Sequence, residues 1–267
     1  MLAGLLALLP ACGAGRRDAL QPRTHDLASL RAEAARHPES AAPHVQMALV
    51  HRQRGEHDQA LASLRQALGR EPLHVAALTL SAQIFYECGR SAEGLQFFAS
   101  RPLSEWPEPV RCDIALLLAD VGETDGARQV LESLRATSVG AAASANLAWL
   151  DLLAGDNAAA ATQLENAQAP EARNNLAVAL LRQGEVERSE SLLRDLVAAH
   201  PEFEPARTNL ALLLLHWHGD AAAADAVAHA AQEPRLSDVA VHQFLNDLVE
   251  DTTSPPPNAG GPDGAQN

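Results

Sequence analysis

The chain has 267 residues and a formal net charge of −14, with 47% hydrophobic but only 3% aromatic residues. The negative charge is scattered, which argues against a nucleic-acid backbone as the main partner, because phosphate binding needs a clustered basic face. Three cysteines are too few for a disulfide framework. Alanine and leucine supply most of the apolar content, which favours helices over strands.

The first segment, MLAGLLALLPAC, is apolar and short. Its first eleven residues cannot span a bilayer, but they suit the hydrophobic region of a signal peptide. The letters LPAC, ending at Cys12, resemble the bacterial lipoprotein box, although Pro10 is less usual there. This resemblance implies a signal peptide over residues 1–11, a lipid on Cys12 and a tether over residues 12–23.

This N-terminal segment bears on the cellular location of the protein. Cys12 is followed by Gly13 and not by Asp, which by precedent among bacterial lipoproteins implies the periplasmic face of the outer membrane. Inner and outer membrane both stay open, and so does the true start of the chain. The alternative is a cytoplasmic protein without a leader, whose apolar start is a coincidence.

Residues 24–40 predict a single helix that covers the N-terminal end of a larger helical array. Thr24 can cap it, Leu27 and Leu30 fall on one face, and Pro38 ends it. A helix of this kind is needed because the terminal faces of repeat arrays must be shielded from water.

Glycines then recur at spacings of 34, 33, 33, 29 and 35 residues. A period near 34 is typical of helix-turn-helix solenoids. The glycines are Gly55, Gly89, Gly122, Gly155, Gly184 and Gly219. An alanine lies seven residues before each of the first five, and a small residue lies five residues after all six. Small residues at both places let two helices cross closely, and a glycine at the corner can end the first helix in a left-handed conformation.

The unit that starts at Ala41 resembles the tetratricopeptide repeat family at Ala48, Gly55, Ala60, Ala67 and Pro72. The resemblance extends over residues 41–234 in six units, although position 4 of a unit is never Trp and the sixth unit has an insertion at HWHGD, so its register is the least certain. It implies an all-α, right-handed α-solenoid of about six helix-turn-helix repeats with a capping helix at each end.

The C-terminal cap is predicted over residues 235–251. Ser237 can cap this helix, and Val241, Phe244, Leu245 and Leu248 fall on one face. Residues 252–267 are rich in Pro, Gly and Asn without apolar residues, so we expect a disordered tail there.

Motifs for catalysis, nucleotide binding or metal binding are missing from the sequence, so we expect no enzyme activity and no cofactor. His216 and His218 are two residues apart, and on a helix they point away from each other, which makes a shared metal unfavourable. We expect exposed imidazoles there, and we also expect His44, His51 and His57 at the surface. Trp106 lies between units and is expected to pack under a loop.

The resemblance implies that the first helix of each unit lines a concave groove. The candidate binding residues are Tyr86, Leu116, Trp149, Leu152, Asn174, Val178, Arg182 and Leu212. Trp149 is expected as an exposed anchor, because a tryptophan facing the groove has no core to fill. The asparagines that recur in the letters NLA, Asn146, Asn175 and Asn209, could bond a bound backbone or tie neighbouring helices together.

The predicted function is a non-enzymatic scaffold, anchored by the lipid on Cys12, that binds another protein or peptide in the groove. Lipoproteins of this build assist pilus, secretion or outer-membrane assembly, and the sequence does not identify the partner or the pathway. The alternatives are a soluble cytoplasmic adaptor or accessory subunit without lipid, and self-association that covers the groove. Cys88 and Cys112 are predicted not to be bonded to each other, because their places in the repeats lie about 13 Å apart along the helix axis.

Overall fold

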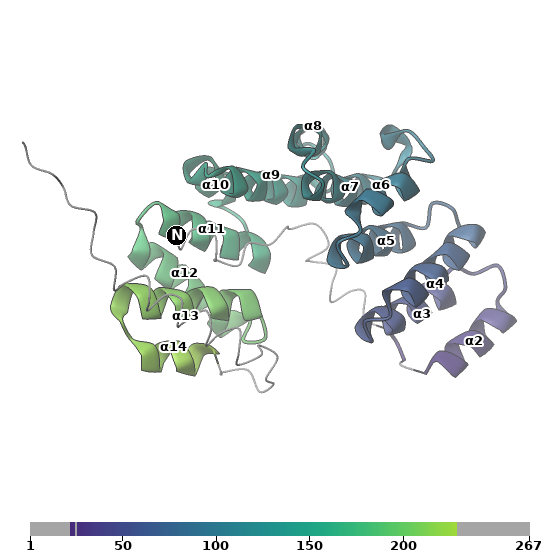
Figure 1. Ribbon diagram of the computed structural model, residues 1–267, viewed down its shortest axis with the longest axis horizontal. Helices are drawn as coiled ribbons and strands as arrows, with labels where there is room; N and C mark the ends of the chain where they lie inside the picture. Colours follow the sequence, from purple (N-terminus) through teal and green to yellow (C-terminus); the bar gives the residue numbers. More distant parts are fainter. Residues whose placement is uncertain (1–21, 25, 229–267) are drawn as a thin grey trace, which may run out of the picture.

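The computed structural model describes residues 22–24 and 26–228, and every regular element in these ranges is a helix (Figure 1). A single helix, α2 (Leu27–Arg36), comes first. Six helix pairs follow: α3 (Ala42–Gln53) and α4 (His57–Arg70), α5 (Val75–Glu87) and α6 (Ser91–Phe98), α7 (Glu108–Asp120) and α8 (Thr124–Leu134), α9 (Gly140–Ala154) and α10 (Asn157–Leu164), α11 (Pro170–Arg182) and α12 (Val186–Ala199), α13 (Glu204–His218) and α14 (Ala221–Ala228).

We call the odd-numbered members of the pairs first helices and the even-numbered members second helices. Each first helix packs against its own second helix and the next pair stacks beside it, so the described chain follows a curved path from α2 to α14 (Figure 1). The expected all-α helical repeat fold is confirmed. A short 3-10 helix, η3 (Leu103–Glu105), interrupts the series between α6 and α7.

The corner of every pair is a glycine in the left-handed region. All six predicted corner glycines have a positive φ, between 63° and 88°. At Gly155 and Gly219 the glycine directly ends the first helix as its cap. Other residues rarely adopt this conformation, so glycine sets where each first helix ends.

Small residues meet where the two helices of a pair cross. Ala48 and Ala60 in the first pair have no exposed surface. In the second pair, a Cβ atom built on Gly94 would lie 2.9 Å from the Cβ of Phe85, so even alanine does not fit there. In the fifth pair, the Ser189 hydroxyl donates to the carbonyl of Ala177 at 2.7 Å. The sixth pair differs, because its Ala211 is only partly buried.

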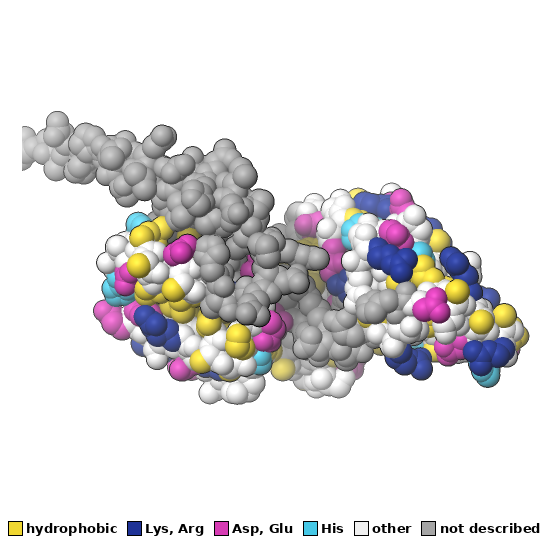
Figure 2. Space-filling view, turned by 90° about the horizontal axis from the view of Figure 1, so that it is seen from below, with side chains coloured by type: hydrophobic (Ala, Val, Ile, Leu, Met, Phe, Trp, Pro, Cys, Tyr) yellow, Lys and Arg dark blue, Asp and Glu magenta, His cyan; other side chains and the backbone are white. Residues whose placement is uncertain are grey.

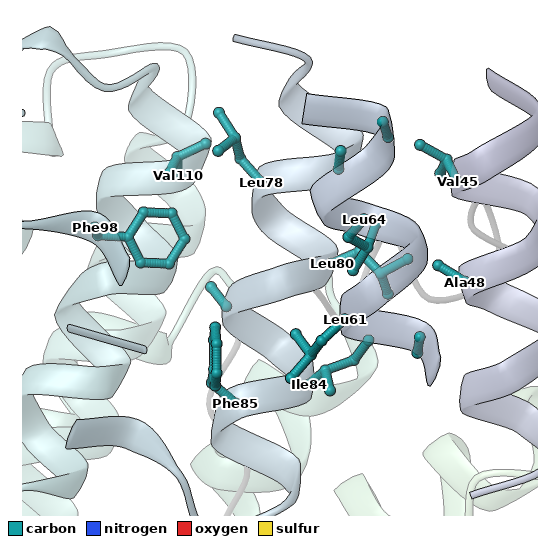
Figure 3. Packing of buried hydrophobic residues seen from close by; sticks show 14 of the residues in the cluster. Val45, Ala48, Leu61, Leu64, Leu78, Leu80, Ile84, Phe85, Phe98 and Val110 are labelled. Atoms are coloured by element: carbon teal, nitrogen blue, oxygen red, sulfur yellow. The ribbon is translucent and has the colours of Figure 1, made fainter. Parts of the chain in front are cut away.

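Larger apolar residues fill the space around these crossings. Figure 3 shows Leu61 and Leu64 of α4 lying between Ala48 on one side and Leu80 and Ile84 on the other. The same core continues through Phe85 and Phe98 to Val110 of the third pair (Figure 3). One apolar core therefore joins successive pairs, which is why a single pair is not an independent folding unit.

The loop after α6 is closed by Trp106, as predicted. Its side chain is buried, its indole N–H donates to the carbonyl of Phe98 at 3.2 Å, and its ring meets the Phe98 ring edge to face with centroids 5.5 Å apart. Because α6 ends early, this tryptophan occupies the space beside the next pair that a longer second helix would fill.

The N-terminal capping helix exists, but Thr24 does not cap it. Asp26 is the cap, because its carboxylate accepts from the backbone N–H groups of Ala28 and Ser29, while the Thr24 hydroxyl accepts from the N–H of Asp26. A carboxylate is favoured over a hydroxyl at the positive end of a helix. Leu30 is buried as expected, and Leu27 packs beside it.

Several expectations lie outside the described residues: the signal peptide over residues 1–11, the lipid on Cys12, the capping helix over residues 235–251 and the tail over residues 252–267. Within the described ranges, no helix combines the length and the hydropathy needed to cross a bilayer.

The crossing in the second pair gives a stability prediction. Gly94→Ala is expected to lower the free energy of unfolding by about 1–3 kcal/mol, because the new methyl group overlaps Phe85. Gly69→Ala is the matched control: nothing lies within 4 Å of a Cβ atom at Gly69, so this helical alanine is expected to stabilise by about 0.5–1 kcal/mol. Urea unfolding of both variants checks the prediction, and equal shifts would contradict the assigned crossing.

Candidate functional site

The candidate site is the side of the first helices that the repeat resemblance implies to line a concave groove. We call this side the groove face. It is defined by the eight candidate residues Tyr86, Leu116, Trp149, Leu152, Asn174, Val178, Arg182 and Leu212, together with the asparagines of the NLA motifs. These side chains come from five consecutive first helices, α5 to α13.

The structure gathers the candidate residues into neighbouring clusters. Leu116 and Trp149 share a buried cluster, and Tyr86 packs against it, so α5, α7 and α9 meet there. Val178 and Leu212 share a second cluster, which also holds residues of α12 and α14. Leu152 belongs to a third cluster, which joins α9, α10 and α11. Most candidate residues therefore belong to the apolar core that joins successive helices.

Trp149 is not the exposed anchor that the sequence suggested. It is only 7% exposed and packs with Cys112 and Leu116 of the preceding first helix and with Leu150 of its own. The expectation was wrong because it treated α9 alone, whereas α7 supplies an apolar surface that the indole covers. A tryptophan with this burial contributes to the packing between repeats.

Two of the three asparagines of the NLA letters, Asn146 and Asn209, tie neighbouring first helices together, which was one of their two predicted roles. Asn209 donates to the side-chain oxygen of Asn174 at 2.8 Å, between α13 and α11, and Asn146 donates to the sulfur of Cys112 at 3.5 Å, between α9 and α7. Each of these asparagines has no exposed surface. A buried amide must be hydrogen-bonded to avoid a large desolvation cost, so these contacts also set the register between repeats.

Two arginines of first helices also bond a neighbouring first helix. Arg182 donates to the carbonyl of Leu152 at 2.9 Å, which joins α11 to α9. Burial lowers the pKa of Arg182, since desolvation disfavours its charged form. Arg52 of α3 forms an ion pair with Glu87 of α5 and donates to it through Nε at 2.9 Å. Sequence reasoning missed these pairings, because their partners lie about one repeat away.

A second set of polar contacts runs along the corners of the repeats. Arg90 bridges Asp58 and Glu93, and these two hydrogen-bonded carboxylates raise the pKa of Arg90. Arg128 bonds Asp151 at 2.7 Å, and Gln163 bonds the other oxygen of the same carboxylate. The Arg90–Asp58 bond joins the start of α6 to α4, and Asp151 of α9 is bonded by both α8 and α10.

The histidines do not form a metal site in the described part of the chain, where no group of three or more His, Cys, Asp or Glu side chains could hold an ion. His216 and His218 are exposed at the end of α13, as expected, and His218 bonds Glu190 at 2.9 Å. His51 is only partly exposed and bonds Glu56 at 2.5 Å, and His57 is also partly buried.

His44 corrects the expectation of a surface residue. It is 5% exposed and neither ring nitrogen has a hydrogen-bond partner among the described residues. It occupies position 4 of its unit, where the tetratricopeptide signature has a large aromatic residue, so its ring fills a core site. Burial, assisted by the charge of Arg70, lowers the pKa of His44.

Cys88 is a free cysteine, so the prediction that it is not bonded to Cys112 is confirmed. The surface in Figure 2 carries arginine and acidic side chains close to one another on the described repeats. That face has no broad basic patch of the kind that binds a phosphate backbone.

These features define a helical-repeat array in which each pair of helices stacks on the next. Residues 45–102 and 164–203 match the tetratricopeptide repeat family. The match covers parts of the array, and the fold over the described residues is that of an all-α helical repeat. No curated protein matches the chain.

One solved structure shows the same fold at low sequence identity, and two others are similar to a lesser degree. The crystal structure of the APC/C hetero-tetramer Cut9–Hcn1 contains a chain with a TM-score of 0.64 and 14% identity, over 86% of this chain and 47% of that one. The present chain thus spans about half the length of that relative. A tetratricopeptide repeat protein from Parabacteroides merdae has a TM-score of 0.48 and 20% identity, over 70% and 77% of the two chains. The structure of Naa15/Naa10 bound to HypK-THB gives 0.37 and 18%, over 88% and 37%.

The burial of Trp149 gives a second prediction. Trp149→Ala is expected to lower the free energy of unfolding by about 3–5 kcal/mol, because it removes a large side chain from a packed contact between repeats. Trp217→Ala is the control, since Trp217 is 40% exposed at the end of α13 and its loss is expected to cost less than about 0.5 kcal/mol. Thermal melting of the two variants compares them directly, and a Trp149→Ala protein as stable as the control would refute the contact.

The buried imidazole of His44 makes stability depend on pH. Its pKa is lower in the folded chain than the ordinary 6.5, so the unfolded chain binds the proton more readily. The stability that neutral His44 supports is therefore complete above about pH 7 and is lost as the pH falls through 6.5 towards the folded pKa. Urea unfolding of the wild type and of His44→Phe at several pH values should show a smaller loss on acidification in the variant. His218→Gln serves as the exposed control, and identical pH profiles for wild type and His44→Phe would contradict this role.

Proposed function

We propose that the protein is a non-enzymatic scaffold that binds a partner protein or peptide along the groove face. The observation that carries this proposal is the stacking of the first helices: α5 to α13 share apolar contacts in one series, hydrogen bonds between first helices hold them in register, and Tyr86 stays partly exposed beside them. An extended chain lying across such a series can contact every repeat in turn, which gives specificity through several small contacts.

The finer part of the proposal is a lipid anchor on Cys12 in a bacterial envelope. Its support is the LPAC sequence after an apolar segment and the glycine-rich stretch behind it. A diacylated cysteine buries many methylene groups, each contributing about 0.8 kcal/mol, which is ample for stable anchoring. In that position the scaffold would serve the assembly of pili, secretion machinery or outer-membrane proteins, as lipoproteins of this build do.

Binding through the groove face is tested at Tyr86, which is only partly buried and so can be changed with limited damage to the core. We expect Tyr86→Ala to reduce the crosslinked recovery of the partner from the native host by about tenfold, and Tyr86→Phe to retain most of it. Arg65→Ala, an exposed change on α4, is the matched control. Circular dichroism must show all three variants folded. Equal recovery by Tyr86→Ala and the control would place binding elsewhere.

The lipid anchor gives a separate prediction. Cys12→Ser is expected to move the protein from the membrane fraction to the soluble fraction of its native host, because the variant cannot carry the proposed lipid. Mass spectrometry of the wild-type N-terminus should then find a diacylated Cys12 as the first residue. An intact Met1, or a Cys12 that is a free thiol or is joined to another cysteine, would contradict the anchor and favour the cytoplasmic alternative.

A further inference from the structure

Exposed large apolar side chains lie at the corners of several repeats. Val121, which directly follows α7, is 40% exposed, Leu153 near the end of α9 is 58% exposed, and Trp217 near the end of α13 is 40% exposed. We call these three residues the corner row. The other exposed large apolar side chains of the described chain lie at the opposite ends of the first helices, and they are Leu73, Val75 and Leu103.

Hydrogen bonds place the corners of the last four pairs side by side. Arg128, near the start of α8, bonds Asp151, near the end of α9, at 2.7 Å. The Gln183 amide, directly after α11, donates to the carbonyl of the first residue of α10 at 3.1 Å. His218, at the end of α13, bonds Glu190 of α12 at 2.9 Å. The corner row therefore follows one continuous edge of the array.

Acidic side chains surround the corner row. Exposed carboxylates that form no ion pair with another described residue lie at all four corners, and we call them the corner carboxylates: Glu123, Asp125, Asp156, Glu187 and Asp220. The arginines near these corners already bond groups of the chain itself, and they are Arg128, Arg182 and Arg188. This edge is therefore an acidic surface with apolar side chains exposed within it.

The first two corners of the array are different. Arg90 bridges Asp58 and Glu93 there, and Arg52 pairs with Glu87, so these acids are neutralised within the chain. None of the exposed large apolar side chains of the described residues lies at these two corners. Unpaired carboxylates and exposed apolar side chains thus occur together at the later corners, which are two independent features of one edge.

Helix capping explains part of the acidity but not the corner row. Asp156 and Asp220 accept from the backbone N–H groups of Ala159 and Ala223, and a carboxylate is favoured at the start of any helix. Capping makes no use of an exposed leucine or tryptophan. A single exposed apolar residue is ordinary, whereas several along one edge, among polar residues, mark a site of interaction.

We propose that the corner row is a second docking surface, separate from the groove face, and that it binds a basic amphipathic helix of a partner protein. The unpaired corner carboxylates select the sign of the partner, because they attract arginine and lysine side chains. They repel a nucleic acid or an anionic lipid surface. They also repel a second copy of the chain, which carries the same carboxylates and a net charge of −14.

The spacing of the corners selects a helix over an extended segment. Neighbouring helices pack roughly 10 Å apart, so successive corners are separated by about that distance. About seven residues of an α-helix rise this far and complete nearly two turns, which returns the side chain to the same face. About three extended residues cover the same distance, but they end on the opposite face of a strand. A helix of about 20 residues passes all four corners.

A designed helical peptide tests this surface directly. The probe has leucine at about every seventh position, arginine on both sides of each leucine, alanine elsewhere and fluorescein at one end. We expect fluorescence anisotropy to show saturable binding at low ionic strength, weakened by added salt because the attraction is partly electrostatic. The same peptide with glutamate in place of arginine is expected not to bind.

Apolar substitutions locate the bound probe. Leu153→Gln with Trp217→Gln should weaken its binding about tenfold, because both side chains lose their contact with the leucines of the probe. Leu73→Gln with Leu103→Gln is the matched control: it also removes two exposed apolar side chains, at the opposite ends of the first helices, and should leave the binding unchanged. Circular dichroism must show both variants folded.

Charge substitutions separate the corner carboxylates from the overall charge. Glu123→Gln with Glu187→Gln should weaken binding severalfold. Glu39→Gln with Glu204→Gln gives the same net charge by exposed changes at the opposite ends of the first helices, and should leave the binding unchanged. Equal effects of the two double variants would mean attraction to the whole chain only and would overturn the proposal.

Three further outcomes would also overturn it: no saturable binding of the arginine probe, equal binding of the glutamate probe, or equal binding by the variants with and without the corner row. A dimer in sedimentation velocity that Leu153→Gln with Trp217→Gln abolishes would assign the corner row to a second copy of the chain instead. Tyr86→Ala should leave the probe bound, so the outcome is independent of binding along the groove face.

Discussion

The close crossing of two helices inside each repeat is the contact on which the rest of the fold depends. It requires a small residue on both helices, and the structure uses alanine, glycine or serine according to the partner across the contact. Gly94 is needed in the second pair because Phe85 stands opposite it, whereas Ala60 suffices where no aromatic ring intrudes. Aromatic rings gather at this crossing in the second pair. The Phe85 ring contacts Phe97, Phe97 contacts Phe98, and Phe98 contacts Trp106.

Polar contacts between repeats then fix how one pair stacks on the next. Ser91 bonds Asp120 at 2.5 Å, and Arg128 bonds Asp151 at 2.7 Å, each linking a second helix to the following first helix. Apolar surfaces of alanine and leucine are smooth and allow sliding, so directional bonds are needed to define one register. In such an array each repeat contacts only its neighbours, and stability is a sum of local terms. The sixth pair, with a partly buried Ala211, has packing from the described residues on one side only.

Sequence reasoning was accurate where the fold depends on periodicity. The corner glycines, the small residues at the crossings and the role of Trp106 all follow from patterns within one or two repeats. It failed to predict the burial of His44 and Trp149, and the physical reason is the same for both. Both were judged from their own helix, while their burial depends on side chains supplied by another helix, Cys112 and Leu116 in the case of Trp149. The sequence also could not distinguish Asp26 from Thr24 as the N-cap of α2. Both residue types can cap a helix, they lie two positions apart, and the backbone conformation decides which one does so.

The hydrogen bonds between first helices have a consequence for any occupant of the groove face. The amides of Asn174 and Asn209 already bond each other, so an occupant that uses them must share or replace an existing contact. The net gain from exchanging one hydrogen bond for another is small, about 0.5–1.5 kcal/mol at most, whereas each buried leucine or valine contributes about 1.5–3 kcal/mol. Binding energy on this face must therefore come mainly from apolar side chains, with the polar groups setting position. An apolar, extended segment with few charges suits such a surface better than an acidic peptide, which would need paired basic residues that these helices do not align.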